Sequence, residues 1–467
     1  MKSDIAVMAH LLRRAGFGAN RAELEEYASR GYEAVVDSLL HPERSPEVDD
    51  DVIGRYNLGV VLQASFAGEA ERWLYRMINT KRRLQEKIAL FWHHVFATAW
   101  YKTEHNPDLV RQIEMFREIG LSDLRTILTR LSRDPAMLDW LDNQENHKDE
   151  PNENYARELL ELFSMGVGNY SENDIKNAAL AFTGWSFVQP IPGYPYGQYP
   201  SEFAYLDEEH DDSEKTFLGE TGRFNGEDVV KIICRQPATP RFVARHMYNF
   251  FVADEVPVPQ WSYTPPRDPA AIEELSQAYM DSDHDIRSML RVLFNSDFFK
   301  NAQYTRVKSP AELVIGTLRM TGEYREPDVE IYGAPREAGF MGQMLMNPPS
   351  VEGWHTGAEW INSGALVDRV NFASAHLGSV DNPGVRAIID RLADMNGGTL
   401  SPEELVDGCL DLVGPLTVSD ETREEMVTTA SRGADVKLRD RQPGDESEQR
   451  VAEVLKMIAS SREYQLA

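Results

Sequence analysis

Two stretches of this chain combine an apolar helical surface with ionisable side chains along one stripe. They run over residues 85–96 and 152–163. On a helical wheel, each stretch places two such groups close together: Glu86 and His93 on the first, Glu158 and Glu161 on the second. Buried ionisable groups are costly unless they are paired or bound to metal. The two stretches therefore predict a polar site inside a helical protein.

The composition narrows the class of protein. Of 467 residues, 42% are hydrophobic and 10% aromatic, which is enough to fill a sizeable core. The net charge of −28 argues against nucleic acid or an anionic membrane as a partner. The two cysteines lie far apart, so neither a disulfide framework nor a thiolate zinc site is expected. No segment reaches membrane-spanning or secretory length, and the chain as written is expected to be cytoplasmic unless an export signal has been removed.

Apolar residues recur at helical spacing along most of the chain, and runs of alternating β-branched residues are scarce. The predicted fold is all-α, a large multi-helix bundle with long irregular loops. Residues 189–210 form a loop rich in proline and tyrosine, which we predict to be an ordered cover over the central helices. Residues 347–361 form a second loop, rich in proline, glycine and tryptophan. We expect a helical core over residues 1–375 and a C-terminal helical segment, 376–467, packed on it.

The first stretch is apolar nearly all round and should be buried. Its polar groups then need internal partners. Glu86 and His93 would pair with each other, His93 would donate to a backbone carbonyl, or both would bind a metal ion.

The second stretch permits two interpretations. Glu158 and Glu161 have the i,i+3 spacing of metal ligands in helical bundles, although the usual signature there is Glu-x-x-His. Arg157 lies four residues from both Glu153 and Glu161, which equally suits a salt-bridged surface helix.

A third polar cluster occupies residues 210–219. Its adjacent His210 and Asp211 resemble the pair of the metal-dependent HD phosphohydrolases, but that pair sits on a helix and this one is expected in a loop. Together with Lys215, these side chains would close over a site built by the helices. The chain has no GxGxxG after a strand, no GxxxxGK[ST], no GxSxG and no HExxH motif.

Short motifs in order along the chain carry a family resemblance. They run from His10-Leu11-Leu12-Arg13-Arg14-Ala15-Gly16-Phe17-Gly18 to Glu463-Tyr464-Gln465, and between these ends lie Phe91-Trp92-His93, Asp134-Pro135-Ala136-Met137, Leu141-Asp142-Asn143, Asn152-Glu153-Asn154, Ala156-Arg157-Glu158-Leu159, Phe182-Thr183-Gly184-Trp185, His210-Asp211, Lys215-Thr216-Phe217-Leu218-Gly219, Lys308-Ser309-Pro310, Pro348-Pro349-Ser350-Val351 and Gly353-Trp354. With these motifs the chain resembles the large bacterial family catalogued as domain of unknown function 1800.

The resemblance implies little about activity, because the family has no settled function. Its members are often predicted to be exported and often neighbour a sulfatase-like family, which implies a sulfatase-like partner protein. The chain departs from the family at Val95, where a second histidine is frequent. If that histidine is a ligand elsewhere, His94 substitutes for it here or the site is altered.

Three functions fit these patterns. The first is a metal-dependent enzyme of unknown substrate, with zinc, iron or manganese held by Glu86, His93, Glu158 and Glu161. A substrate-facing set would surround the metal: Asn154, Arg157, His210, Asp211 and Lys215. The second is a non-catalytic helical binding or assembly protein that uses its aromatic-rich loops. The third is metal-free acid–base chemistry by Glu158 and His93, whose pKa values burial would have to shift.

Overall fold

The computed structural model describes residues 2–49, 66–189, 199–328, 331, 333–431, 435–439, 441 and 445–467. Helices dominate this part of the chain, and its strands form three separate two-stranded antiparallel sheets. The all-α prediction is confirmed over the described residues. None of the helices described there is long and apolar enough to cross a membrane.

Helices are the main elements in the first half of the chain. Its helices are α1 (Lys2–Arg14), α2 (Arg21–Arg30), α3 (Tyr32–Leu40), α6 (Phe66–Asn79), α7 (Arg83–Val95), α8 (Trp100–Thr103), α9 (Asn106–Ile119), α10 (Leu124–Ser132), α11 (Pro135–Trp140), α12 (Asn154–Glu161), α13 (Glu172–Ala181) and α14 (Gly226–Cys234).

The second half continues the same pattern. Its helices are α15 (Ala238–Phe251), α16 (Pro269–Asp281), α17 (Ile286–Asn295), α18 (Asp297–Lys300), α19 (Pro310–Thr321), α20 (Ala334–Phe340), α21 (Ser363–Leu377), α22 (Pro383–Ala393), α23 (Pro402–Leu412), α24 (Asp420–Ala430) and α25 (Glu446–Ser460).

The sheets are short. Two of them are hairpins, which pair β1 (Trp185–Val188) with β2 (Glu202–Tyr205) and β3 (Lys215–Phe217) with β4 (Glu220–Gly222). The third pairs β5 (Thr399–Leu400) with β6 (Val436–Lys437), and α23 and α24 lie between these two strands in the chain. In the first hairpin, Trp185 is opposite Tyr205 and Val188 is opposite Glu202. The middle of the predicted cover, residues 190–198, lies outside the described residues, so the cover stays a prediction.

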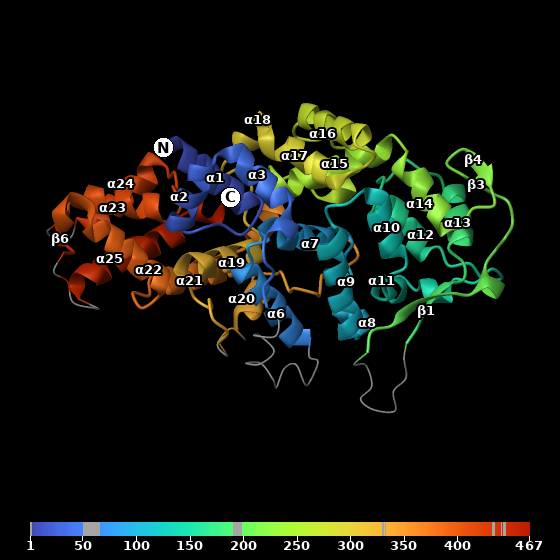
Figure 1. The fold of residues 1–467 in the computed structure, drawn as a ribbon, viewed down its shortest axis with the longest axis horizontal. Helices are drawn as coiled ribbons and strands as arrows, with labels where there is room; N and C mark the ends of the chain where they lie inside the picture. Colours follow the sequence, from blue (N-terminus) through green and yellow to red (C-terminus); the bar gives the residue numbers. More distant parts are fainter. Residues whose placement is uncertain are drawn as a thin grey trace.

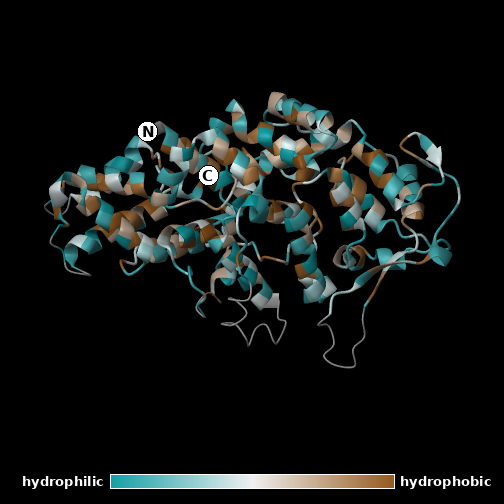
Figure 2. Ribbon diagram, in the orientation of Figure 1, coloured by the Kyte–Doolittle hydropathy of each residue, from teal (hydrophilic) through white to brown (hydrophobic). Residues whose placement is uncertain are grey.

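The molecule is elongated, with α22–α25 at one end and α10–α14 with the first two hairpins at the other (Figure 1). Helices α7 and α19 lie in the middle. Apolar residues gather on the sides of the helices that face one another, and polar residues lie outside (Figure 2). This is the amphipathic arrangement that the helical periodicity predicts. The boundary between residues 375 and 376 stays a prediction, although α25 packs on both α21 and α23.

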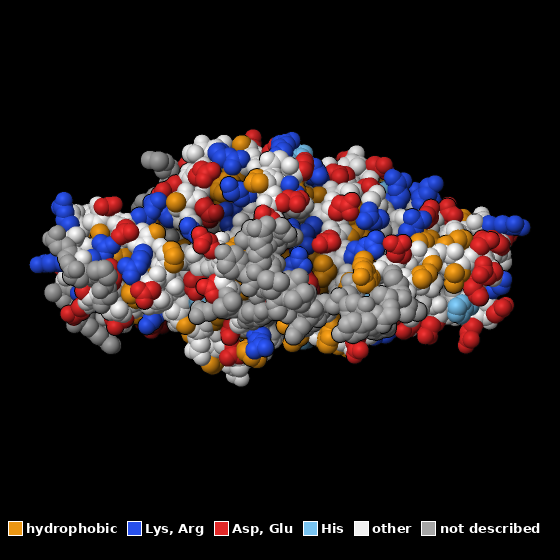
Figure 3. Space-filling view, turned by 60° about the horizontal axis from the view of Figure 1, so that its bottom comes forward, with side chains coloured by type: hydrophobic (Ala, Val, Ile, Leu, Met, Phe, Trp, Pro, Cys, Tyr) orange, Lys and Arg blue, Asp and Glu red, His pale blue; other side chains and the backbone are white. Residues whose placement is uncertain are grey.

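Acidic and basic side chains are interspersed on the face shown in Figure 3, with small apolar groups between them. The acidic excess is therefore spread over this surface and does not form one continuous acidic field there. Such a surface is that of a solvated acidic protein.

Helix α19 begins with a capping box, and one of its two residues, Glu312, also forms ion pairs in the interior of the molecule. The Ser309 hydroxyl accepts from the Glu312 backbone N–H at 3.3 Å, and the Glu312 carboxylate accepts from the Ser309 N–H at 2.8 Å. Pro310 occupies the first helical position, where it has no N–H to leave unpaired.

The same Glu312 carboxylate forms buried ion pairs with Lys87 of α7 and with Arg306. Burial alone would raise the pKa of Glu312, but Arg306, Lys87 and the nearby Arg14 together hold it well below its usual value. Burial lowers the pKa of Lys87 to about 8, and Glu312 opposes that change. The ion pairs therefore fix α7 against α19.

Replacing Glu312 with glutamine should reduce the free energy of unfolding by about 3–5 kcal/mol, because it leaves the buried cations without their counter-charge. Urea denaturation of the variant and the wild type measures this difference. Glu273→Gln is the matched control, since its ion pair with Arg241 is largely exposed and should contribute about 0–1 kcal/mol. Equal losses in the two variants would contradict the role given to Glu312.

Candidate functional site

Helix α7 is buried on nearly all sides, as its sequence predicts. Its Glu86 carboxylate accepts from Trp73 Nε1 at 2.9 Å and from Arg117 Nε at 2.9 and 3.0 Å. Glu86 is therefore paired internally, but with arginine and tryptophan. The predicted Glu86–His93 pair is not formed.

His93 is completely buried, and neither ring nitrogen has a hydrogen-bond partner within the described residues. Its ring makes edge contacts with Trp73 and Trp354, with centroids 5.6 and 5.2 Å away. Burial, reinforced by His94, lowers the pKa of His93 to about 3. His93 is thus a neutral imidazole enclosed by two tryptophans, and the predicted bond to a backbone carbonyl is absent as well.

Trp354 belongs to the 347–361 loop, which is described throughout and lies against the end of α7. Its backbone N–H donates to His94 Nδ1 at 3.3 Å, and its ring stacks on the His94 ring at 6.2 Å between centroids. Gly353 allows this approach, because a Cβ there would lie 2.3 Å from the His94 carbonyl oxygen. Its φ of +85° also favours glycine.

The carboxylates of α12 lie near a third acid from the same loop. Burial raises the pKa of Glu158 to about 7, and the charges of Glu161 and Glu352 add to this effect against that of Arg157. Glu161 accepts from the Tyr170 hydroxyl at 2.9 Å. Among the described residues, the side chains of Glu158 and Glu352 have no hydrogen bond or ion pair. Glu158 is therefore poised to exchange a proton near neutral pH.

The outer residues of α12 form a salt-bridged surface. Arg157 pairs with Glu153 at 3.1 Å and with Glu172 of α13 at 2.9 Å. It forms no ion pair with Glu161, the other partner that the spacing allows. Asn154 is exposed, and its side chain lies 3.5 Å from Asp142. Neither Arg157 nor Asn154 lies against α7 as a substrate-facing group.

The third polar cluster supports its own hairpin. His210 Nδ1 lies 3.0 Å from the Thr183 carbonyl oxygen, and the Asp211 N–H donates to the Thr183 hydroxyl. Lys215 is buried and donates to the carbonyls of Asp211 and Ser213. These bonds hold the β3–β4 hairpin beside α13. They do not bring the cluster to α7.

The predicted metal centre is not assembled by these placements. Across the described ranges, no group of three or more histidine, cysteine, aspartate or glutamate side chains is arranged to hold a metal ion. The four predicted ligands lie in three different environments. Glu86 is paired with Arg117, His93 is enclosed by two tryptophans, and Glu158 and Glu161 lie on α12.

A groove that the sequence did not reveal runs along the end of α12. We name it the α12–α15 groove. It has a volume of about 800 Å³ and is lined by residues 161–169, the start of α15, side chains of the 258–266 segment, and Glu352. Phe242 and Trp261 form its aromatic wall, and His246 packs behind them with its ring centroid 4.6 Å from each. Most of its lining is thus apolar or aromatic, with carboxylates along one side.

A small cavity lies on the other side of the 347–361 loop, and we name it the Trp354 cavity. Its lining comes from α7, α15, the start of α19 and the loop itself: His94, His246, Asn249, Phe250, Arg306, Ser309, Gln343, Trp354, His355, Thr356 and Trp360. Burial and Arg306 lower the pKa of His94 to about 4. Burial, with His94 and Arg245 adding to it, lowers that of His246 to about 3. Both imidazoles are neutral at pH 7.

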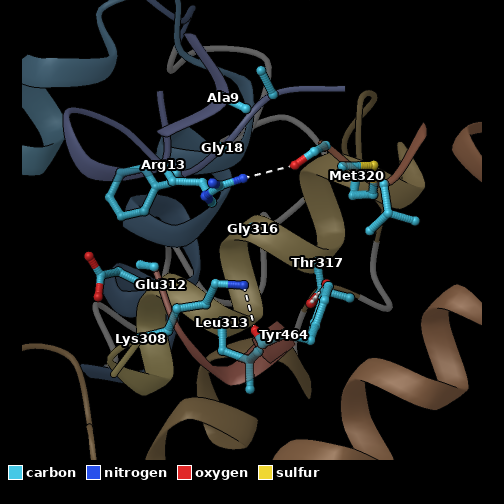
Figure 4. A pocket seen from close by; sticks show the side chains of 15 residues that line it. Ala9, Arg13, Gly18, Lys308, Glu312, Leu313, Gly316, Thr317, Met320 and Tyr464 are labelled. Atoms are coloured by element: carbon cyan, nitrogen blue, oxygen red, sulfur yellow. Dashed lines mark hydrogen bonds between the residues drawn. The ribbon is translucent and has the colours of Figure 1, made fainter. Parts of the chain in front are cut away.

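A further cavity between α1 and α19 is closed by its own bonds (Figure 4). Arg13 donates to the Gly414 carbonyl at 2.9 Å, and Lys308 donates to the Tyr464 carbonyl at 2.6 Å. The Thr317 and Tyr464 hydroxyls lie 3.0 Å apart. Several of its polar groups thus bind one another, although Arg13 Nε has no partner among the described residues.

Four motif-bearing segments of the sequence meet around the 347–361 loop: Phe91-Trp92-His93, Ala156-Arg157-Glu158-Leu159, Lys308-Ser309-Pro310 and Gly353-Trp354. A family profile described as "Protein of unknown function (DUF1800)" matches residues 10–466. The chain belongs to the DUF1800 family. No curated protein matches it. No solved structure matches it either.

Gly353→Ala should destabilise this DUF1800 protein more than Gly219→Ala does. Both glycines have φ near +85°, so the cost of the backbone conformation is shared. A Cβ meets nothing within 4 Å at Gly219, but at Gly353 it meets His94. We expect the difference to be about 1–3 kcal/mol, measured from urea denaturation of the two variants. Equal losses of stability in the two variants would show that the 347–361 loop can shift away from His94 without lowering the free energy of unfolding.

Glu158→Gln should stabilise the protein at pH 8 but not at pH 4. The folded-state pKa is raised from 4.5 to about 7, so the stability contributed by proton binding is present at low pH and lost as pH rises through this window. Glutamine cannot ionise, so the free energy of unfolding at pH 8 should rise by about 1 kcal/mol, after allowance for the partial exposure of Glu158. Thermal unfolding against pH measures it, with the exposed Glu33→Gln as the control. A gain that is the same at both pH values would contradict the assignment.

Proposed function

We propose that this protein binds a small organic ligand in the α12–α15 groove and that Glu158 exchanges a proton with it. One observation carries the proposal: the carboxyl group whose pKa is raised to about 7 is coupled to Glu161 and Glu352, which line the groove. A general acid–base works best when its pKa is near the working pH. The carboxylate and its conjugate acid would both be present at pH 7.

The lining of the groove suggests the kind of ligand. Apolar and aromatic walls with a few convergent polar groups are typical of small-molecule sites. Arg245 already donates to Glu255 and to three backbone carbonyls, and Arg241 pairs with Glu273 at the surface. The polar groups left for a ligand are therefore mainly carboxylates. We expect a molecule with an apolar body and a group that donates hydrogen bonds.

No step of this proposal runs through a metal ion. Glu86 is occupied by Arg117, and the donor groups of the described residues are not arranged for zinc, iron or manganese. The expected metal and the expected sulfatase-like partner remain hypotheses from the sequence. Element analysis of the purified protein tests the first of them.

The non-catalytic alternative shares the groove and differs only at Glu158. A binding or assembly protein would use the aromatic wall without proton exchange. Calorimetry of ligand binding at pH 7, in two buffers with different ionisation enthalpies, separates these functions. Proton uptake or release that disappears in Glu158→Gln supports acid–base chemistry, and its absence in the wild type supports binding alone.

The groove itself is tested by Val167→Trp. Val167 is 47% exposed on the groove wall, so a larger side chain fills the groove without disturbing the core. Ligands found by a thermal-shift screen of small metabolites should bind the variant at least tenfold more weakly. Val367→Trp, at a 57% exposed position on α21, should leave their affinity unchanged. Equal affinities in the two variants would place the ligand elsewhere.

A further inference from the structure

The Trp354 cavity is lined by side chains whose acceptor atoms are already in use. Asn249 Oδ1 accepts from the Glu255 backbone N–H at 2.9 Å, and Gln343 Oε1 accepts from the Ala311 N–H at 2.9 Å. Both residues are about 5% exposed or less. Their amide NH₂ groups make no hydrogen bond within the described residues. Each amide therefore offers the cavity two free N–H donors, while its oxygen already has one partner.

Three more lining residues follow the same rule. His94 Nδ1 accepts from the Trp354 backbone, so in its neutral form the hydrogen is on Nε2. The Ser309 hydroxyl oxygen accepts from the Glu312 N–H, which leaves its own hydrogen without an acceptor in the described residues. Arg306 uses Nε for the Asn249 carbonyl and Nη1 for Glu312, and its Nη2 has no such partner.

The charges behind the cavity are also unbalanced. Arg306, Lys87, Arg14 and Arg369 are all buried, and each interacts electrostatically with Glu312. A second carboxylate, Asp254, acts on Arg14 and lies 3.9 Å from Arg306. Four buried cations thus face two carboxylates, inside a protein whose net charge is −28. Buried charge in excess is costly unless a counter-charge is bound.

We infer that the Trp354 cavity binds a small anion, held by Arg306 and by the surplus donors of Asn249, Gln343 and His94. The cavity has a volume of about 20 Å³, which admits a group the size of a water molecule or a halide. His355 lines it with a 65% exposed side chain, so the cavity reaches the surface there. The ligand is either a free monovalent anion or the carboxylate of a larger molecule that enters from this side.

The α1–α19 cavity offers a partial comparison. There Arg13 Nη1 and Lys308 Nζ each donate to a backbone carbonyl, as Figure 4 shows, although Arg13 Nε has no partner among the described residues. In the Trp354 cavity, Trp354 Nε1 and His246 Nε2 are buried without a partner among the described residues, and the free Arg306 Nη2 lies on the same cation that Glu312 binds.

The test uses the full-length protein in a sodium 2-(N-morpholino)ethanesulfonate buffer, whose anion carries no carboxylate and is too large for the cavity. Chloride, bromide or formate then replaces this sulfonate at constant ionic strength, and thermal unfolding is followed. We expect the small anions to raise the Tm in a saturable manner. Bromide-soaked crystals should show an anomalous peak between Arg306 and Gln343. A response to formate but not to the halides identifies a carboxylate as the ligand chemistry.

Gln343→Glu makes the test specific, because the new carboxylate keeps the acceptor for Ala311 and itself supplies the negative charge. The variant should lose the response to small anions, with at least a tenfold weaker apparent affinity. Asn249→Asp should behave in the same way if Gln343→Glu does not fold. Gln277→Glu, an identical change at an exposed position, should keep the full response. The inference is overturned if small anions do not raise the Tm of the wild type, or if they raise the Tm of both cavity variants as much as that of the wild type. This outcome does not depend on whether the α12–α15 groove binds its ligand.

Discussion

The carboxylate of Glu312 is the interaction on which the centre of this protein depends. It accepts from the backbone that begins α19, pairs with Lys87 of α7 and pairs with Arg306. One side chain thereby sets the start of a helix, joins two helices and places the arginine that lines the Trp354 cavity. Without this carboxylate, the buried cations Lys87, Arg306 and Arg14 would repel one another with only Asp254 of the carboxylates named around them to oppose this.

The 347–361 loop separates the α12–α15 groove from the Trp354 cavity. Glu352 lines the α12–α15 groove and Trp354 lines the small cavity, with Gly353 pressed on His94 between them. A movement of this loop would alter both spaces at once. The loop therefore acts as a common wall, and its position is fixed by a contact that only a residue without a side chain can make.

The fold class could be predicted from the sequence because helical periodicity is a local property. The neighbourhood of the site was also visible, since Glu158 and His93 stand out on apolar helices. Their partners could not be predicted. Arg117 reaches Glu86 from another helix, and the groove is built from segments as far apart as Glu161 and Glu352.

His246 and Arg306 gave no signal of their own in the sequence. His246 lies on an ordinary amphipathic helix, and only the neighbouring Lys308-Ser309-Pro310 motif pointed towards Arg306. Two details of the polar contacts could not be predicted, for the same reason. Arg157 has a partner on α13 in place of Glu161, and the His210–Lys215 cluster is bound to its own hairpin. Choices among several polar partners are made by tertiary packing, which a single helical wheel does not contain.

The ion pair between Lys87 and Glu312 spans 225 positions of the chain. At a synthesis rate of about 5–20 residues per second, Glu312 is made roughly 10–45 s after Lys87. During that interval α7, which the finished fold buries on nearly every side, has neither α19 nor the counter-charge of its lysine. The centre of the protein can close only late in synthesis. Until then, the surfaces of α7 that the finished fold buries lack the partners that cover them.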